Sequence, residues 1–349
     1  MVIFEVVRAL IMFAMAFVVA LIITPFVARF LEKFNLRKFN IRDEKEAPVF
    51  HQFHKNKSGT PTMGGIIIWG TVLGLALIFF LCKTFFDGFA NYLNFVNRAE
   101  TYLPLAAMLV AAALGLADDL IGILGFAKAK GGGIKVRHKL IMYTLIAILG
   151  AWWFYFKLGF DHLYIPFIGN FYVGFWYVPF FMFILIATAF STNETDGLDG
   201  LAGGILLFAF ASLTVVAFIL HRYDLAVMGS AILGALLAFL WFNIYPAKFF
   251  MGDTGSMALG ITLGVMAMLT NTAFLLPFFG FILVLESLSV ILQLISKKVF
   301  KKKIFLSTPI HHHFEALGWP ESQVTMRFWI ISAAVSTLGL VLFFLARFI

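Results

Sequence analysis

The chain has 349 residues, of which 62% are hydrophobic and 13% charged, a composition far outside the range of soluble globular proteins. Apolar runs of about 18–25 residues recur from end to end, which favours membrane-spanning helices over the short alternating segments of a membrane β-barrel. Beside such runs, the net charge of +8 indicates basic loops near anionic lipids or phosphates, and no nucleic-acid partner is expected. The one cysteine, Cys82, excludes an intramolecular disulfide.

The sequence predicts an all-α polytopic membrane protein, with residues 1–349 forming a single integral membrane domain. The first apolar segment is too long for the h-region of a signal peptide, so we expect it to be the first span. About ten transmembrane helices are predicted. Their approximate ranges are 5–31, 63–82, 102–120, 140–158, 174–192, 201–220, 225–242, 256–272, 274–296 and 326–348.

An even number of spans puts both termini on one side of the membrane, and the distribution of Lys and Arg predicts which side. With the termini outside, most of the 26 Lys and Arg residues fall in or beside the inner loops, where such residues are enriched. The outer side keeps Arg8, Lys83, Arg98, Lys157, Arg222 and Arg347. The sequence therefore predicts that both termini are outside.

The link Ser191–Gly204, with the sequence STNETDGLDGLAGG, carries the highest density of polar groups between two predicted spans. It contains Asn193, Glu194, Asp196 and Asp199 among four glycines. Carboxylates at a membrane surface either stay hydrated or face a cation or a polar ligand. We interpret the link as part of a polar site at the membrane face.

Two further carboxylate motifs lie on the same predicted side. Asp118 and Asp119 close an apolar run, where adjacent carboxylates form either a hydrated helix end or a pair neutralised by a cation. Asp253 lies between glycines in MGDTGS, just before a predicted helix. Such an aspartate either caps the helix or presents its carboxylate to Mg²⁺, while backbone N–H groups face phosphate.

Histidine and lysine complete the polar set on this side. The consecutive His311, His312 and His313 either bind a metal or act beside phosphates as hydrogen-bond donors or proton carriers. Lys57 precedes the second span and serves either as a membrane anchor or as a phosphate-binding charge.

All these polar clusters fall on the inner face, and this predicts one composite site. Glu286 lies within a predicted span and away from that face, so we expect it to have a structural role. The acidic residues of the outer loops are expected to be scattered. They are Asp87, Glu100, Asp161 and Asp224.

Five segments together resemble the phospho-N-acetylmuramoyl-pentapeptide transferase family, within the polyprenyl-phosphate N-acetylhexosamine-1-phosphate transferase superfamily. The resemblance runs from about Lys57 through the last span. The segments are GTPTMGG (59–65), ADD (117–119), N-x-TDGLDGLA (193–202), NIYPAKFFMGDTGS (243–256) and PIHHHFEALGWPESQVTMRFW (309–329).

The resemblance implies an enzyme of the bacterial plasma membrane with its active site on the cytoplasmic face. Such an enzyme transfers phospho-MurNAc-pentapeptide from UDP-MurNAc-pentapeptide to undecaprenyl phosphate, giving UMP and lipid I for peptidoglycan synthesis. The resemblance also implies a requirement for Mg²⁺ and a homodimer. Carboxylates and basic residues are the groups that phosphoryl transfer needs, because the reaction depends on positioning and charge neutralisation.

The resemblance also implies residue roles. Asp253 is expected to be the principal Mg²⁺ ligand, and Asp118 and Asp119 to serve the polyprenyl phosphate, one as base or nucleophile. The three histidines are expected to lie near the phosphates. Expected substrate-binding residues are Lys57, Thr62, Lys139, Asn193, Asp196, Gly197, Leu198, Asp199, Asn243 and Phe250, with Phe250 stacking on uracil.

The chain departs from the family pattern at two positions. Gly122 stands where a lysine often follows the aspartate pair, and Lys128 or Lys130 is the candidate replacement for that charge. Glu194 stands where the family usually has an apolar residue, which puts the roles in its loop in doubt.

Two other functions compete with this interpretation. One is a sister transferase that uses UDP-GlcNAc or another UDP-aminosugar, against which the histidine motif argues. The other is a transporter or lipid flippase, which would place charged groups near the membrane midplane and often show internal repeats.

Overall fold

The computed structural model describes residues 2–37, 59–85, 88–98, 100–124 and 134–348. Almost all of the secondary structure is helical, with one antiparallel hairpin in which His162 pairs with Tyr172. The α-helices are α1 (Val2–Lys33), α3 (Ile66–Phe85), α4 (Phe89–Leu93), α5 (Tyr102–Ile123), α6 (Val136–Trp152), α7 (Tyr177–Thr195), α8 (Leu201–Ile219), α9 (Tyr223–Asn243), α10 (Gly252–Leu269), α11 (Leu276–Phe279), α12 (Phe281–Val299), α13 (Ile310–Ala316) and α14 (Glu321–Phe348). The shorter elements are η2 (Trp153–Lys157), β1 (His162–Ile165), β2 (Gly169–Tyr172), η3 (Gly174–Trp176) and η4 (Ala273–Leu275).

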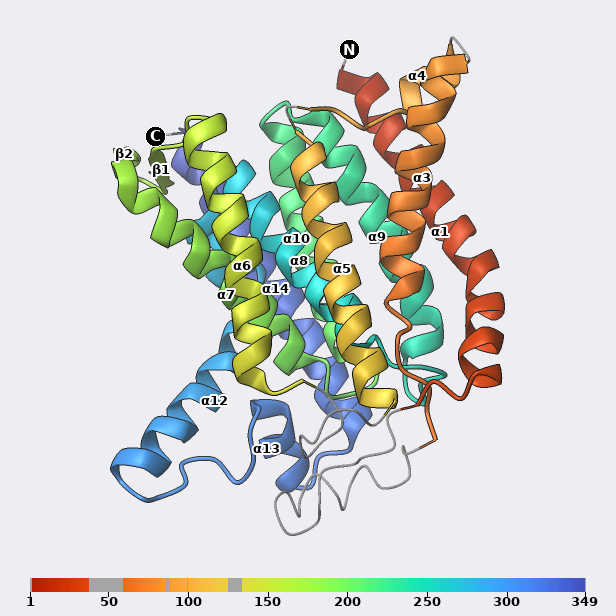
Figure 1. Cartoon of the computed structure of the whole chain (residues 1–349). Helices are drawn as coiled ribbons and strands as arrows, with labels where there is room; N and C mark the ends of the chain where they lie inside the picture. The colour runs from red at the N-terminus through yellow and green to blue at the C-terminus, as the bar shows by residue number, and fades with distance from the viewer. Residues whose placement is uncertain (1, 38–58, 86–87, 99, 125–133, 349) are drawn as a thin grey trace.

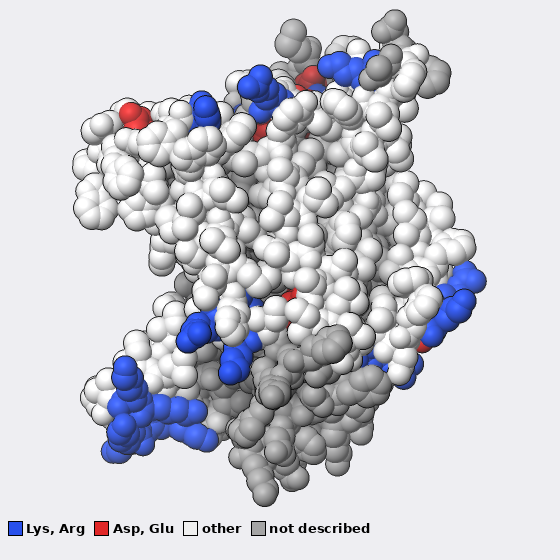
Figure 2. All heavy atoms as spheres, in the orientation of Figure 1, with Lys and Arg blue, Asp and Glu red and all other residues white. Residues whose placement is uncertain are grey.

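The prediction of an all-α polytopic membrane protein is confirmed. Within the described residues, nine helices are long and apolar enough to cross a membrane, and α11 with α12 makes a tenth if this bent pair is one span. Figure 2 shows a broad uncharged band between two ends where charged side chains gather, as expected for a protein surrounded by lipid.

Helix α10 forms the centre of the bundle and is buried along its whole length. It packs mainly against α5 and α7. A Cβ added to Gly260 would lie 2.8 Å from the Cα of Ala189 in α7, so glycine allows these two helices to approach closely. This close packing fixes the first turn of α10 against the ends of its neighbours.

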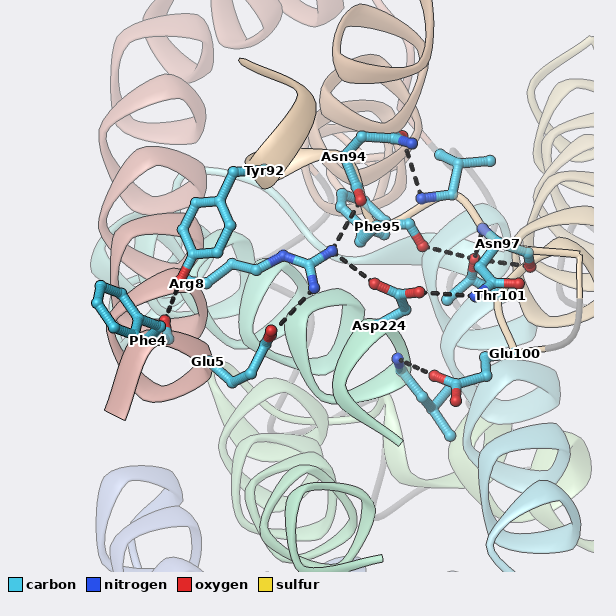
Figure 3. Close-up of polar contacts among 12 residues, drawn as sticks. Phe4, Glu5, Arg8, Tyr92, Asn94, Phe95, Asn97, Glu100, Thr101 and Asp224 are labelled. Carbon is cyan, nitrogen blue, oxygen red and sulfur yellow. Dashed lines mark hydrogen bonds and ion pairs between the residues drawn. The ribbon is translucent and has the colours of Figure 1, made fainter. Parts of the chain in front are cut away.

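Figure 1 places both termini and the β1–β2 hairpin at one end of the bundle and α13 at the other. The end with the termini carries a polar network, drawn in Figure 3, that joins α1, α9 and the segment before α5. Arg8 pairs with Asp224 at 2.5 Å, and Asn97 donates to the other oxygen of Asp224 at 2.8 Å. Glu100 accepts from the backbone N–H of Leu225 at 3.2 Å.

This network corrects the expectation that the outer acidic residues are scattered. Asp224 and Glu100 meet in one network because α9 begins beside the segment that leads into α5. Asp161 instead pairs with its neighbour His162, and Asp87 lies outside the described residues.

The ninth predicted span is not straight. Its two parts, Ala273–Phe279 and Phe281–Val299, meet at an angle of 89° at Gly280. As a result Glu286 lies near the start of α12 and accepts from His311 of α13, with 3.0 Å between Nδ1 and the carboxylate oxygen. The expectation that Glu286 lies away from the predicted site is therefore wrong.

Helix ends also differ from the predicted ranges near the polar motifs. Helix α7 continues to Thr195, so Asn193 and Glu194 are helical, and only residues 196–200 connect it to α8. Helix α5 continues past the aspartate pair to Ile123. Helix α10 begins at Gly252, which places Asp253 in its first turn.

Candidate active site

Residues 61–65 and 250–252 form the floor of the candidate site. The backbone N–H of Phe250 donates to Pro61, and those of Gly64 and Gly65 donate to Phe250 and Met251, each at 2.8 Å. These bonds bring two motifs that lie far apart in the sequence side by side.

Gly252 is the point at which four elements meet. Its backbone has φ +75°, and its N–H donates to Asp196 at 3.0 Å. A Cβ at this position would lie 2.7 Å from the hydroxyl of Thr62 and 2.8 Å from a carboxylate oxygen of Asp119. Both the left-handed backbone and the close contacts require glycine.

A chain of charged contacts joins Asp118 to Asp253. The ammonium of Lys139 lies 2.8 Å from Asp118 and 2.5 Å from Asp253. The amide of Asn193 donates to the same oxygen of Asp253 at 2.5 Å and to the hydroxyl of Ser256 at 3.0 Å. Asp118 is fully buried and Asp253 is 5% exposed, so one ammonium holds two buried carboxylates together.

Asp119 contacts the beginning of α10. Its carboxylate accepts the backbone N–H of Thr254 at 3.0 Å. The hydroxyl of Thr254 receives a hydrogen bond from the indole of Trp69 and donates to the carbonyl of Ala112. The positive end of a helix dipole favours such a carboxylate and would equally favour a phosphate.

The 196–200 link is held by side chains from distant elements. Asp199 accepts the N–H of Ala247 at 3.0 Å, and its own N–H donates to Glu321 at 2.6 Å. Asn243 accepts the N–H of Gly200 at 3.1 Å and donates to the carbonyl of Phe249 at 2.8 Å. Most of these polar groups are committed to shaping the link.

The hydrophobic side chains at the site differ in their exposure. Phe250 is half-buried, but Phe249 is fully buried and packs against Phe239 and Phe242. Phe249 is therefore not available to stack on a base. Leu198 is 4% exposed and packs in the hydrophobic core.

The three histidines point to different partners. His311 contacts Glu286, and its Nε2 edge faces Gly197 of the 196–200 link. His312 contacts Glu315 at 2.7 Å, and His313 accepts the N–H of Leu306 at 3.2 Å. His311 is thus the histidine that lies directly against the link between α7 and α8.

Several predicted residues are brought together and others fall outside the described part. Thr62, Lys139, Asn193 and Asp196 lie in the cluster around Asp253 and Gly252. Lys57, Lys128 and Lys130 lie outside the described residues.

Sequence reasoning missed two acidic residues that hold the site in shape. The sequence predicts a structural role for Glu286 away from the site, and it predicts no role for Glu321 of α14. The one sequence signal for Glu321 is the proline that precedes it, because proline is typical of a helix start and so predicts that Glu321 lies in a first turn.

The oxygen donors of this cluster suit a hard divalent cation. Within the described residues no three His, Cys, Asp or Glu side chains form a ready-made metal cluster. Mg²⁺ commonly takes only one or two protein carboxylates and completes its shell with water and phosphate oxygens. The bridging ammonium of Lys139 shows that Asp118 and Asp253 lie within reach of one cation.

An apolar pocket of about 550 Å³ opens between α7, α11 and α12. Its wall includes Phe183 and Phe190 of α7 and Leu288 and Ile291 of α12. Ser191, two residues before Asn193, also lines it and bonds to Ser287 at 2.6 Å. The pocket therefore reaches the helix end that carries part of the polar cluster.

Comparison with known proteins agrees with these motifs. A family model described as glycosyl transferase family 4 matches residues 101–271. A motif described as phospho-N-acetylmuramoyl-pentapeptide-transferase signature 1 matches residues 57–68.

Curated relatives match over almost the whole chain. Proteins named phospho-N-acetylmuramoyl-pentapeptide-transferase from Chloroflexus aurantiacus and Rubrobacter xylanophilus are 37% and 36% identical to it, each over 95% of this chain. The matches cover 89% and 96% of those proteins. The relative of that name from Borrelia garinii is 38% identical over 93% of this chain and 92% of its own length. With this identity along nearly its full length, the chain belongs to the phospho-N-acetylmuramoyl-pentapeptide-transferase family.

Proposed function

We propose that the protein transfers phospho-MurNAc-pentapeptide from UDP-MurNAc-pentapeptide to undecaprenyl phosphate, releasing UMP and forming lipid I for peptidoglycan synthesis. It acts in the bacterial inner membrane as a homodimer, with its site on the cytoplasmic face. The observation that carries this proposal is the cluster Asp118–Lys139–Asp253–Asn193 in a chain with full-length relatives of that name.

The reaction replaces one phosphoanhydride bond with another. A phosphate oxygen of the polyprenyl phosphate forms a bond to the phosphorus that carries the sugar, and the bond from that phosphorus to UMP breaks. Asp253, with Asp118 in reach, would hold Mg²⁺, which neutralises diphosphate charge when bound. Asp118 and Asp119 serve the acceptor phosphate, one of them as base or nucleophile.

The link between α7 and α8 serves the uridine end of the donor. Its backbone is held by Asp196, Asp199 and Asn243, which leaves a fixed surface beside Gly197. Phe250, half-buried at the floor of the site, stacks on the uracil. His311 lies against this link and is placed to donate to, or take a proton from, a bound phosphate.

The pocket between α7 and α12 accommodates part of the polyprenyl chain. Its lining is almost entirely apolar, and it ends at Ser191 beside the polar cluster. A lipid lying there would place its phosphate near Asn193 and Lys139, because Asn193 is two residues from Ser191 and Lys139 is next to Leu140, both of the pocket wall.

The direct test measures UMP release with polyprenyl phosphate as acceptor. Asp253→Asn and Asp118→Asn should each lower Mg²⁺-dependent turnover by at least about 100-fold, because each removes a charge that the transferred phosphoryl group requires. The control is Glu32→Gln, an exposed carboxylate at the end of α1, which should keep normal turnover. Normal turnover in both aspartate variants would contradict the site.

The donor is tested separately. UDP-MurNAc-pentapeptide and UDP-GlcNAc are supplied to the same preparation with the same acceptor, and UMP release is compared. Faster turnover with UDP-GlcNAc would assign the protein to the sister activity. Uptake of a solute into proteoliposomes without UMP release would assign it to transport.

A further inference from the structure

Helix α12 has its polar and apolar faces reversed relative to a helix of a soluble protein. Its exposed face is apolar, with 62% of Leu294 and 63% of Val299 accessible. The other exposed apolar residues of this face are Leu288, Ile291, Leu292 and Ile295. After the first turn its buried face is polar and comprises Glu286, Ser287, Ser289, Gln293 and Ser296. The bend of 89° before α12 turns this apolar face away from the bundle.

The segment after α12 folds back and is fixed to the polar face. Gln293 accepts the N–H groups of Ile304 and Phe305 and donates to the carbonyl of Phe305 at 2.9 Å. Ser296 donates to the carbonyl of Lys302 at 2.9 Å, and the left-handed backbone of Lys301 reverses the chain. The end of α12 and the segment after it are therefore held together by specific hydrogen bonds.

This end carries a dense group of positive charges, which we call the lysine tip. The lysine tip consists of Lys297, Lys298, Lys301, Lys302 and Lys303. All of them are exposed, and the sequence contains no acidic residue from 294 to 314. Within the described residues none of them has an ion pair. Figure 2 shows this cluster at the lower left, where Figure 1 places the end of α12.

Apolar side chains stand between the lysines. Phe300 is 68% exposed and Ile304 is 59% exposed. An exposed apolar helix face that ends in lysines interleaved with apolar residues matches the boundary between acyl chains and headgroups. Clusters of four to eight basic residues at such a boundary attract anionic lipids, each contributing about fivefold in affinity.

We propose that the lysine tip is a binding site for anionic phospholipid headgroups, with the apolar face of α12 resting on the acyl chains of the same leaflet. Charge complementarity selects this occupant, because a zwitterionic headgroup such as phosphatidylcholine has no net negative charge to attract the lysines. The bound lipids hold the bent helix, and with it one wall of the apolar pocket, at the membrane surface.

The test titrates the full-length protein in detergent with phosphatidylglycerol or with phosphatidylcholine of the same chains and counts bound lipids by native mass spectrometry. The unmodified protein should bind phosphatidylglycerol more tightly, and binding should weaken with added salt. The triple variant K301Q/K302Q/K303Q should lose about 100-fold in phosphatidylglycerol affinity. Its substitutions are exposed and keep the backbone bond from Ser296, so thermal unfolding should be unchanged.

The matched control is R29Q/K33Q/K248Q, which removes three exposed cations from the end of α1 and from the link between α9 and α10. It should keep phosphatidylglycerol affinity. Equal binding of both lipids, or an equal loss in the control, would overturn the proposal. So would a lysine-tip variant that keeps phosphatidylglycerol affinity but has a raised KM for polyprenyl phosphate, because the lysines would then serve the substrate. The lipid-binding measurements themselves need no turnover, so they still test the lysine tip if the proposed transferase activity fails its own test.

Discussion

At the scale of single residues, Lys139 is the cation on which the buried carboxylates depend. Its ammonium bridges Asp118 and Asp253, and its side chain is only 14% exposed. Removing one partner of a buried charged group costs about 3–5 kcal/mol, because the remaining charges stay desolvated and uncompensated. Lys139→Met should therefore lower the free energy of unfolding by about 3 kcal/mol and abolish UMP release.

Added Mg²⁺ should restore part of the stability of Lys139→Met, because a divalent cation can take the place of the ammonium between the two carboxylates. Thermal unfolding in detergent, with and without Mg²⁺, measures this. Lys248→Met, which removes an exposed lysine lying over Phe242, should show neither effect. A Lys139→Met protein with unchanged stability, or one indifferent to Mg²⁺, would contradict the bridging role.

Glu286 orients a histidine of the site. Its carboxylate lies 3.0 Å from Nδ1 of His311, both side chains are fully buried, and the opposite edge of the ring faces Gly197. Glu286→Gln weakens the hydrogen bond to His311 while keeping the volume of the side chain. We expect kcat to fall by about tenfold or more with little change in the KM of the UDP donor.

The control for Glu286 is Ser289→Ala, one turn further along the buried face of α12, which should keep normal kcat. Steady-state measurements with both substrates separate kcat from KM. A Glu286→Gln variant with normal kcat would assign Glu286 to packing alone.

The sequence predicts those parts of the candidate site that lie within one short segment of the chain. Asp118, Asp253 and the 193–199 segment stand out because carboxylates at the end of an apolar run are costly to place there without a cation or a polar ligand. No comparable sequence signal predicts two other contacts of the site. These are the contact between Glu286 and His311 and the contact between Glu321 and Asp199. Each joins residues from different helices, and nothing in the spacing of either partner indicates the other.

At the scale of elements, Arg8 fastens α1 to the rest of the bundle. It is 6% exposed, pairs with Glu5 and Asp224, and donates to the carbonyl of Asn94 at 2.7 Å. Arg8→Met should lower the free energy of unfolding by about 3 kcal/mol, since it leaves Asp224 without its cation. Turnover per folded molecule at low temperature should be unchanged, because this network and α13 lie at opposite ends of the bundle.

Chemical or thermal unfolding in detergent measures the effect of Arg8→Met, and Arg98→Met, an exposed arginine at the same end, is its control. Equal stability of the two variants would show that the network contributes nothing. Lost turnover in protein that remains folded would show coupling between the two ends of the bundle.

The same network predicts a pH dependence through Glu100. Burial raises the pKa of the Glu100 carboxyl above 4.5, and the negative charge of Asp224 acts in the same direction, against the hydrogen bond from Leu225. A carboxyl with a raised folded-state pKa favours the folded state below its unfolded pKa. That contribution is lost as the pH rises through the folded-state pKa.

Glu100→Gln is neutral at every pH and keeps an oxygen for the N–H of Leu225. The unfolding temperature of this variant should match the unmodified protein at acid pH and exceed it increasingly toward neutral pH. A difference that shrinks as the pH rises would have the wrong sign for a raised pKa.

The number and order of spans could be predicted because a long apolar run in a chain of this composition is typical of a membrane-spanning helix. The break at Gly280 could not, because the apolar run continues through it and its cause is tertiary. Helix α12 carries Gln293 and Ser296 on one face, and both side chains bind the segment that follows the helix. This polar face needs hydrogen-bond partners, which lipid beside a straight span would not provide.

At the scale of the whole molecule, the fully buried α10 sets the relation between the two ends. Its first turn carries Asp253, and its last turn leads to Asn271, whose side chain accepts the N–H of Tyr164 in the hairpin. The charged cluster and the hairpin thus lie at opposite ends of one central helix. If α10 spans the membrane, the two lie on opposite faces.

Accessibility to a membrane-impermeant thiol reagent tests that arrangement and its orientation. In a Cys82→Ser background, Ile168→Cys places a thiol on the hairpin, where Ile168 is 74% exposed, and Lys302→Cys places one in the lysine tip. The excess of Lys and Arg at the end that carries the site predicts that this end is cytoplasmic. Intact cells should therefore label Ile168→Cys alone, and inside-out vesicles should label Lys302→Cys alone. Labelling of both thiols from the same side would refute the arrangement, and the reverse pattern would place the carboxylate cluster outside, away from a cytoplasmic nucleotide donor.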